Sequence, residues 1–169
     1  MSQRYYTRFD ETVPFGSSVV KDLTLSLQDV VIKEPDGRVV FAMKDVEARN
    51  FWSNRARRGV AQKYFAQDRE TSVVTMCEGV AETIANAGVD QGYFDEDHRR
   101  TFYDELLYSL LHQFASFNSP VWFNVRLWHR YGLKGSGGNW AWSDSLAAAE
   151  RVLTSYERPQ CSACFILDV

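Results

Sequence analysis

The clearest pattern in the sequence is a row of apolar residues between positions 95 and 117. Their spacing of three and four residues places them on one face of a helix, and the row comprises Tyr103, Leu106, Leu107, Leu110, Leu111 and Phe114. Asp95 is a good N-cap, and acidic residues follow it in the first turn. The pattern predicts a helix from Asp95 that is stopped by Asn118-Ser119-Pro120, because a residue before proline avoids the helical region.

Two more helices are predicted before this one. In the first, from 50 to 66, apolar side chains recur every four residues: Trp52, Ala56, Val60 and Tyr64. The basic residues between them are expected on a solvated face: Arg55, Arg57, Arg58 and Lys63. The second helix is expected to be capped by Thr71 and ended by Gly88. Its apolar face comprises Val73, Cys77, Val80, Ala81 and Ile84.

Shorter elements are expected on both sides of the helices. Strand-like apolar runs flank Glu34-Pro35-Asp36-Gly37 and predict a β-hairpin between Leu23 and Val46. Residues 143–156 are alanine-rich and predict a short helix, and Phe165–Leu167 predicts a strand. The aromatic-rich stretch 121–131 fits either type of element. Residues 1–22 show no period and are expected to form an extended arm.

Composition narrows the class of protein. With 169 residues, 45% of them apolar and 24% charged, the chain suits one globular domain and is too short to suggest two. The net charge of −3 gives no electrostatic case for nucleic-acid binding. No apolar run approaches the ~20 residues that span a bilayer, and the polar start lacks a signal peptide. We therefore expect a cytoplasmic protein without nucleic-acid or membrane partners.

Most residues whose side chains or spacing suggest binding or catalysis have a structural explanation. The loop Gly135–Gly138 lacks the lysine and hydroxyl residue of a P-loop and is expected to be a flexible connection. His98, His112 and His129 form no metal-binding pattern, so no metal site is expected. His112 and Cys77 are both expected to serve packing, His112 through a hydrogen bond.

Cys161-Ser162-Ala163-Cys164 has redox spacing and leaves several interpretations open. The first interpretation is half of a zinc site, although no second pair of ligands is present in the chain. The second is a thioredoxin-like pair, although such pairs open a helix and this one precedes a strand. The third is one redox cysteine at the head of a strand, facing a site built with other segments. Inert thiols are the fourth interpretation.

The end of the chain bears on these interpretations. A strand that has just begun at Phe165 leaves backbone edges in need of partners. Either it is an edge strand that pairs with the early hairpin, or the remainder of its sheet lies on another polypeptide or was lost.

Several segments occur in the order in which they stand in class II ribonucleotide reductases, and from about residue 50 the chain resembles that family. The matching segments are 52–53, 60–65, 69–73, 114–125 and 156–166. The most specific are Asn-Ser-Pro-Val-Trp-Phe-Asn at 118–124 and Ser-Ala-Cys-Phe-Ile at 162–166.

The resemblance implies a fold that is mainly α with a small β-hairpin. In this family a helical N-terminal domain leads into the first strand of a ten-stranded α/β barrel, and the remainder of the barrel would be absent from this chain. The implied domains are an N-terminal arm (1–22), a helical domain with the hairpin (23–158) and the start of the catalytic barrel (159–169).

The resemblance also implies chemistry: an adenosylcobalamin-dependent ribonucleoside-diphosphate reductase that removes the 2′ hydroxyl through a thiyl radical. Cys164 matches the N-terminal member of the pair of reducing cysteines. Ser119 matches a hydroxyl that contacts bound nucleotide, and Ala163 and Cys164 match positions where the strand touches substrate. Cys161 has no role in that mechanism. A thioredoxin-type reductant is the implied partner of the full enzyme.

The other cysteines of the mechanism and most contacts to adenosylcobalamin belong to parts of the family's sequence beyond Val169. Arg126 stands where the family pattern has glycine. We therefore expect a reductase portion that is inactive until a remaining segment joins it. The alternatives are a non-catalytic binding module or truncated relic derived from a reductase, and a small redox or zinc protein that uses Cys161 and Cys164.

Overall fold

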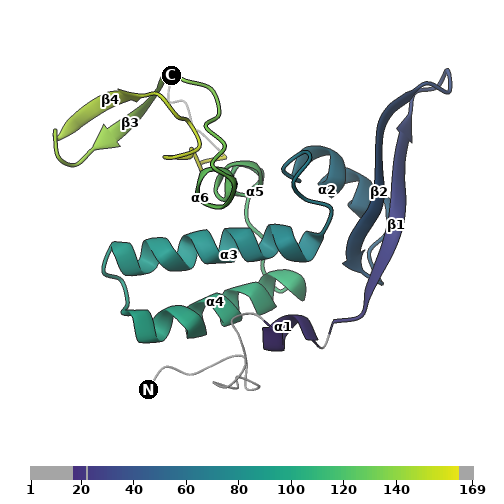
Figure 1. Ribbon diagram of the computed structural model, residues 1–169, viewed down its shortest axis with the longest axis horizontal. Coiled ribbons are helices and arrows are strands. Elements are labelled where there is room, and N and C mark those ends of the chain that lie inside the picture. Colours follow the sequence, from purple (N-terminus) through teal and green to yellow (C-terminus); the bar gives the residue numbers. More distant parts are fainter. Residues whose placement is uncertain (1–16, 22, 164–169) are drawn as a thin grey trace, which may run out of the picture. The chain divides into compact units, whose positions relative to one another are not determined.

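The computed structural model describes residues 17–21 and 23–163. The chain divides into two compact units, Met1–Ser116 and Phe117–Val169. Residues 112–118, which carry no helix or strand, span the boundary between the two units. Figure 1 labels the helices and strands of both units.

The predicted β-hairpin is confirmed in the first unit. Strands β1 (Leu25–Lys33) and β2 (Val39–Arg49) pair antiparallel, and β2 runs further than the pattern suggested. The turn closes through a bond from the Glu34 N–H to the Arg38 carbonyl, at 2.9 Å. Gly37 adopts a φ of 87°, which glycine tolerates without a steric penalty.

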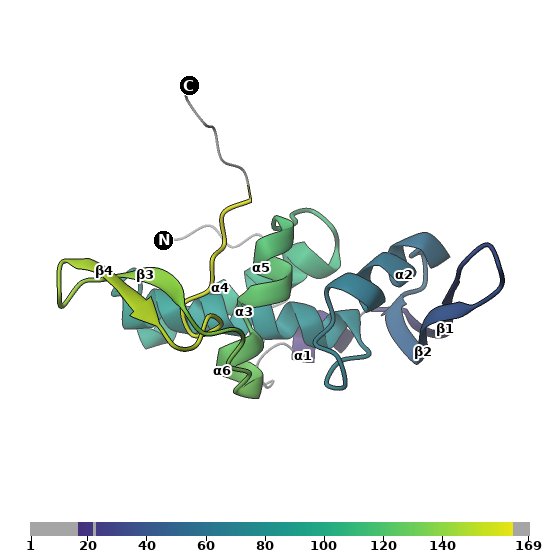
Figure 2. The same cartoon turned by 90° about the horizontal axis from the view of Figure 1, so that it is seen from above.

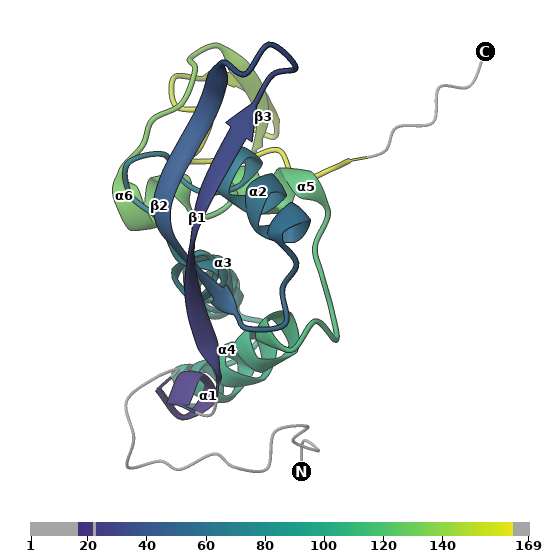
Figure 3. The ribbon, with the colours of Figure 1, turned by 90° about the vertical axis from the view of Figure 1, so that its right-hand side faces the viewer.

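Helix α2 (Asn54–Lys63) packs against this hairpin through a different face from the one predicted (Figure 3). Its buried residues are Arg57 and Ala61. The four apolar residues that recur at intervals of four are exposed or half-buried instead. The expectation that Arg57 is solvated is wrong, because the hairpin offers it backbone carbonyls; Arg55, Arg58 and Lys63 are exposed as predicted.

The arginine at position 57 is fully buried. Its Nη1 donates to the carbonyls of Ser26, at 2.9 Å, and Val46, at 3.0 Å. Its Nη2 donates to the Ser26 hydroxyl and, at 3.1 Å, to the Arg49 carbonyl. One guanidinium therefore ties helix α2 to both strands, and its burial lowers the pKa of the group below the usual value.

The core of the first unit lies between α3 (Val73–Asp90) and α4 (Glu96–Leu111), which lie side by side in Figure 1. Both predicted apolar faces are confirmed in the main. The buried members are Val73, Cys77, Val80, Ala81, Tyr103, Leu107, Leu110 and Leu111. Asp95 caps α4 as predicted, accepting a bond from the His98 N–H at 3.0 Å.

Three predicted helix boundaries are wrong. Ser72 caps α3 in place of Thr71, because its hydroxyl accepts from the Val74 N–H at 3.0 Å. Gly88 lies inside α3, where the absence of a side chain makes room for the Phe94 ring. Helix α4 ends at Leu111, and Phe114 is exposed.

The described part of the expected N-terminal arm includes a short helix, α1 (Ser17–Lys21). Its Val19 side chain is buried. This portion of the arm is therefore helical.

The second unit contains two short helices and a second hairpin. The helices are α5 (Ser119–Asn124) and α6 (Leu127–Tyr131). The predicted helix at 143–156 is wrong, since β3 (Asn139–Ser143) and β4 (Ala148–Val152) pair antiparallel (Figure 2). A turn with Ala147 at a φ of 47° reverses the chain and overrides the helix propensity of alanine.

The described fold is therefore mixed α/β, with a two-stranded sheet in each unit, and the expectation of a single hairpin is corrected. The expected strand Phe165–Leu167 lies outside the described residues. Among the described helices, none is both long and apolar enough to cross a membrane.

Candidate functional site

The three site residues expected from the sequence differ in location and in whether the structure describes them. Ser119 is the first residue of α5 and is exposed. Ala163 is exposed and is the last described residue. Cys164 lies outside the described residues. The structure therefore bears on the site through α5 and through the backbone that leads to Ala163.

Helix α5 is built by the segment that was expected to end a helix. Asn118 caps it, with its Oδ1 accepting from the Val121 N–H at 3.3 Å. Pro120 occupies the first turn, where its missing N–H costs nothing. The Trp122 indole is buried and donates to the Phe117 carbonyl at 2.9 Å. Proline here begins a helix, so the orientation of Ser119 is fixed by a capped first turn.

Two side-chain amides of this region hold the segment that leads to Ala163. Asn118 Nδ2 donates to the Cys161 carbonyl at 2.9 Å. Asn124 Nδ2 donates to the Gln160 carbonyl at 3.0 Å. The structure thus places side by side the two stretches, around Ser119 and before Ala163, that were singled out on sequence. Sequence reasoning missed both asparagines, because an amide with a distant carbonyl partner leaves no local pattern.

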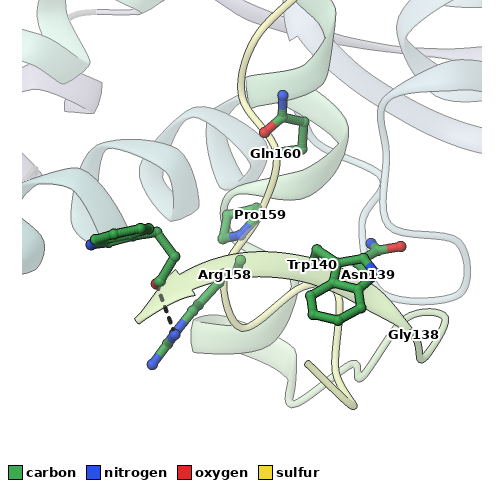
Figure 4. Close-up of a pocket in the computed structure, with 8 residues that line it drawn as sticks. Gly138, Asn139, Trp140, Arg158, Pro159 and Gln160 are labelled. Carbon is green, nitrogen blue, oxygen red and sulfur yellow. Dashed lines mark hydrogen bonds between the residues drawn. The ribbon is translucent and has the colours of Figure 1, made fainter. Parts of the chain in front are cut away.

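A third contact anchors the same segment to the second hairpin. Arg158 Nη1 donates to the Trp142 carbonyl at 3.1 Å and to Glu150 Oε1 at 3.0 Å. Figure 4 shows Arg158 reaching toward the hairpin, with Pro159 and Gln160 continuing away from it. These residues and strand β3 line an open hollow of about 820 Å³. The hairpin supplies exposed aromatic rings to it, Trp140 and Trp142.

Cys161 is half-buried within this anchored segment. Its Sγ donates to the Pro159 carbonyl at 3.4 Å. Burial raises the pKa of the thiol above its usual value. A thioredoxin-like nucleophile needs a depressed pKa, so the environment of Cys161 disfavours that interpretation.

Arg126 has a clear structural role at the position where the family pattern has glycine. It is fully buried, and its guanidinium donates to the Trp122 carbonyl. Its backbone is right-handed helical, a conformation that any residue adopts. Arginine therefore fits here without strain and links α6 to α5.

The three histidines have different local partners. His98 pairs with Asp95, and His129 is exposed on α6. His112 Nδ1 lies 3.1 Å from Arg49 Nη1, and its ring stacks on Tyr108. Burial, and then the charge of Arg49, lower the pKa of His112. The hydrogen-bonded packing role expected for His112 is confirmed. Among the described residues, no group of three or more His, Cys, Asp or Glu side chains could hold a metal ion.

Comparison with known proteins identifies the family. The family model described as "Class II vitamin B12-dependent ribonucleotide reductase" matches residues 26–68 and 66–113. A vitamin B12-dependent ribonucleotide reductase of Rhodopirellula baltica is 40% identical over 168 residues, which cover 95% of this chain and 16% of the relative. Proteins of the same description are 42% identical over 105 residues in Streptomyces coelicolor and 29% identical over 194 residues in Bradyrhizobium diazoefficiens.

The chain is short beside these relatives. The alignment with the Streptomyces coelicolor protein covers 58% of this chain and 11% of that protein, and the Bradyrhizobium diazoefficiens alignment covers 91% and 16%. The chain thus spans about a sixth or less of their length. The family model and the relatives agree: the chain belongs to the class II, vitamin B12-dependent ribonucleotide reductases, as an amino-terminal segment.

Proposed function

We propose that this chain is the N-terminal portion of an enzyme that converts ribonucleotides to deoxyribonucleotides, and that it acts only together with the remaining reductase segment. The observation that carries the proposal is the pair of bonds from Asn118 and Asn124 to the carbonyls of Cys161 and Gln160. They bring the nucleotide-contacting candidate Ser119 next to the backbone that leads to Ala163 and Cys164. Both stretches belong to the chain's resemblance to the family.

Cys164 would supply one of the two thiols that are consumed in each turnover. A thiyl radical on another segment removes the 3′ hydrogen of the ribonucleotide and later returns it. The 2′ hydroxyl leaves as water, and two thiols give up two electrons and two protons and become a disulfide. Ser119 would hydrogen-bond the bound nucleotide, and the backbone at Ala163 would touch it. A strand-mounted thiol suits this task because its position is fixed.

Adenosylcobalamin, when bound to the full enzyme, would supply the radical that starts the reaction. The hollows described here do not fit so large a group. One is the open surface beside Trp140, and the other is an apolar notch of about 400 Å³ between α3 and α4. Pockets of 300–1,000 Å³ suit ligands of ordinary drug size. We therefore propose that most contacts to the cofactor come from outside this chain.

The remaining partners follow from the chemistry. The disulfide formed with Cys164 must be reduced after each turnover, and a thioredoxin-type dithiol is the reductant we propose. The cytoplasm is the proposed compartment, because its redox systems keep thiols reduced.

Complementation tests the proposal. The chain is mixed with a second polypeptide that carries the remainder of the Rhodopirellula baltica relative, and cobalamin-dependent formation of deoxyribonucleotide is assayed. We expect activity from the mixture and none from either polypeptide alone. Cys164→Ser should abolish turnover but leave nucleotide binding largely intact, whereas Cys161→Ser should be nearly silent.

Two outcomes would contradict the proposal. A stable complex without activity would refute the idea that the chain completes an enzyme, and would leave it a non-catalytic module. Equal losses from the two cysteine variants would refute the assignment of Cys164.

A further inference from the structure

Asn118 uses both ends of its side-chain amide. Oδ1 accepts from the Val121 N–H at 3.3 Å and caps α5, while Nδ2 donates to the Cys161 carbonyl at 2.9 Å. Capping requires only an acceptor, which Asp, Ser or Thr supplies equally well. An amide is needed only where a donor is required as well.

Asn124 repeats the second contact from the other end of the same helix. Its Nδ2 donates to the Gln160 carbonyl at 3.0 Å. Two successive carbonyls are therefore held by two amides that one short helix carries. Arg158 fixes the preceding residues to the β3–β4 hairpin, through the Trp142 carbonyl and Glu150. The segment 158–161 is thus tied down at three points within one unit.

We propose that Asn118 and Asn124 are positioning residues: they fix the backbone at 160–161 against α5 and thereby limit how far from Ser119 the chain can carry the Cys164 thiol. This inference rests on the proposed function of Cys164. A chain extends by at most about 3.3–3.6 Å per residue. An anchor at Cys161 therefore restricts the reach of the residues that follow it.

The two roles of Asn118 can be separated by single substitutions. Asn118→Asp keeps the acceptor that caps α5 and removes the donor to Cys161, whereas Asn118→Ala removes both. Asn124→Asp removes the other donor without altering a cap. Asn50→Asp is the matched control, because Asn50 is an exposed asparagine of the first unit, outside the hollow and the segment it borders.

The readout is the rate of thiol alkylation by iodoacetamide, as a function of pH, in the full chain. Cys161 is the reporter in a Cys164→Ser background, and Cys164 is the reporter in a Cys161→Ser background. Because Cys161 is half-buried with a raised pKa, releasing its segment should expose the thiol. We expect Asn118→Asp and Asn124→Asp each to raise its alkylation rate by roughly threefold to tenfold, because the thiol of a released segment is more accessible to the reagent. The Cys164 rate should change in the same variants, and Asn50→Asp should match the parent.

The inference is overturned if Asn118→Asp leaves both thiol rates and their pH profiles unchanged, because Asn118 would then be a helix cap only. In the complemented reductase, Asn118→Asp should lower kcat and leave KM for the ribonucleotide nearly unchanged. Changed thiol rates in a mixture that never forms deoxyribonucleotide would count against the proposed function alone. Unchanged thiol rates in an active mixture would count against the positioning role alone.

Discussion

Arg57 shows how a charged residue becomes part of a core. Its guanidinium is fully buried, and the oxygen atoms that accept its hydrogen bonds are all neutral, three of them backbone carbonyls of the hairpin. Among the described residues, its Nε has no hydrogen-bond partner. A buried charge is costly unless it is well bonded, so the bonds to the carbonyls are what makes this arrangement tolerable.

Arg57→Ala should destabilise the first unit by about 3 kcal/mol or more, because each buried acceptor left without a donor costs ~1–3 kcal/mol. Urea unfolding followed by circular dichroism measures the change. Arg55→Ala is the control, since Arg55 is exposed on the same helix, and it should stay within about 0.5 kcal/mol of the parent. Equal effects from the two variants would show that the carbonyl bonds of Arg57 contribute nothing.

At the scale of elements, the helical glycines of α2 and α3 differ in the space that a side chain would have. A Cβ built on Gly88 would lie 2.2 Å from the Phe94 ring, whereas a Cβ on Gly59 would meet nothing within 4 Å. Both residues lie inside helices, so intrinsic propensity favours alanine at each by about 1 kcal/mol. Only packing distinguishes them.

Gly88→Ala should therefore destabilise the α3–α4 pair by about 1–3 kcal/mol, because overpacking outweighs the gain in propensity. Gly59→Ala should instead stabilise the protein by up to about 1 kcal/mol. The urea midpoints of the two variants, compared with the parent at constant slope, give the answer. If both variants were stabilised, Phe94 would not pack against Gly88 as the structure shows.

At the scale of the whole molecule, the division into two units carries its own prediction. Short helices and a two-stranded ribbon are marginal alone, and the second unit consists of these. The slowest backbone amides in hydrogen exchange should accordingly belong to α3 and α4, with faster exchange in α5 and the β3–β4 hairpin. Arg57→Ala should accelerate exchange in the first unit and leave the second unchanged. Acceleration of both units together would show that they open as one.

The candidate site was accessible to sequence only in part. Ser119, Ala163 and Cys164 were singled out through family resemblance, and the structure shows Ser119 on a capped helix beside the segment that ends at Ala163. The bonds that hold this segment join residues more than thirty positions apart, from Asn118 to Cys161 and from Asn124 to Gln160. A bond between a side-chain donor and a distant carbonyl produces no periodicity in the sequence, so no sequence pattern could predict these bonds.

The sequence by itself determined the elements whose signals are local. The first hairpin follows from a turn between apolar runs, and the start of α4 follows from the cap at Asp95, because the interactions that form them lie within a few residues. Tertiary structure decided the features in which distant atoms compete with local preference. In the tertiary structure Arg57 is buried and Gly88 lies inside α3. The alanine-rich stretch after Ser143 belongs to the β3–β4 strand pair. In each case a carbonyl, an aromatic ring or a partner strand outside the element outweighed a propensity of about 1 kcal/mol or less per residue.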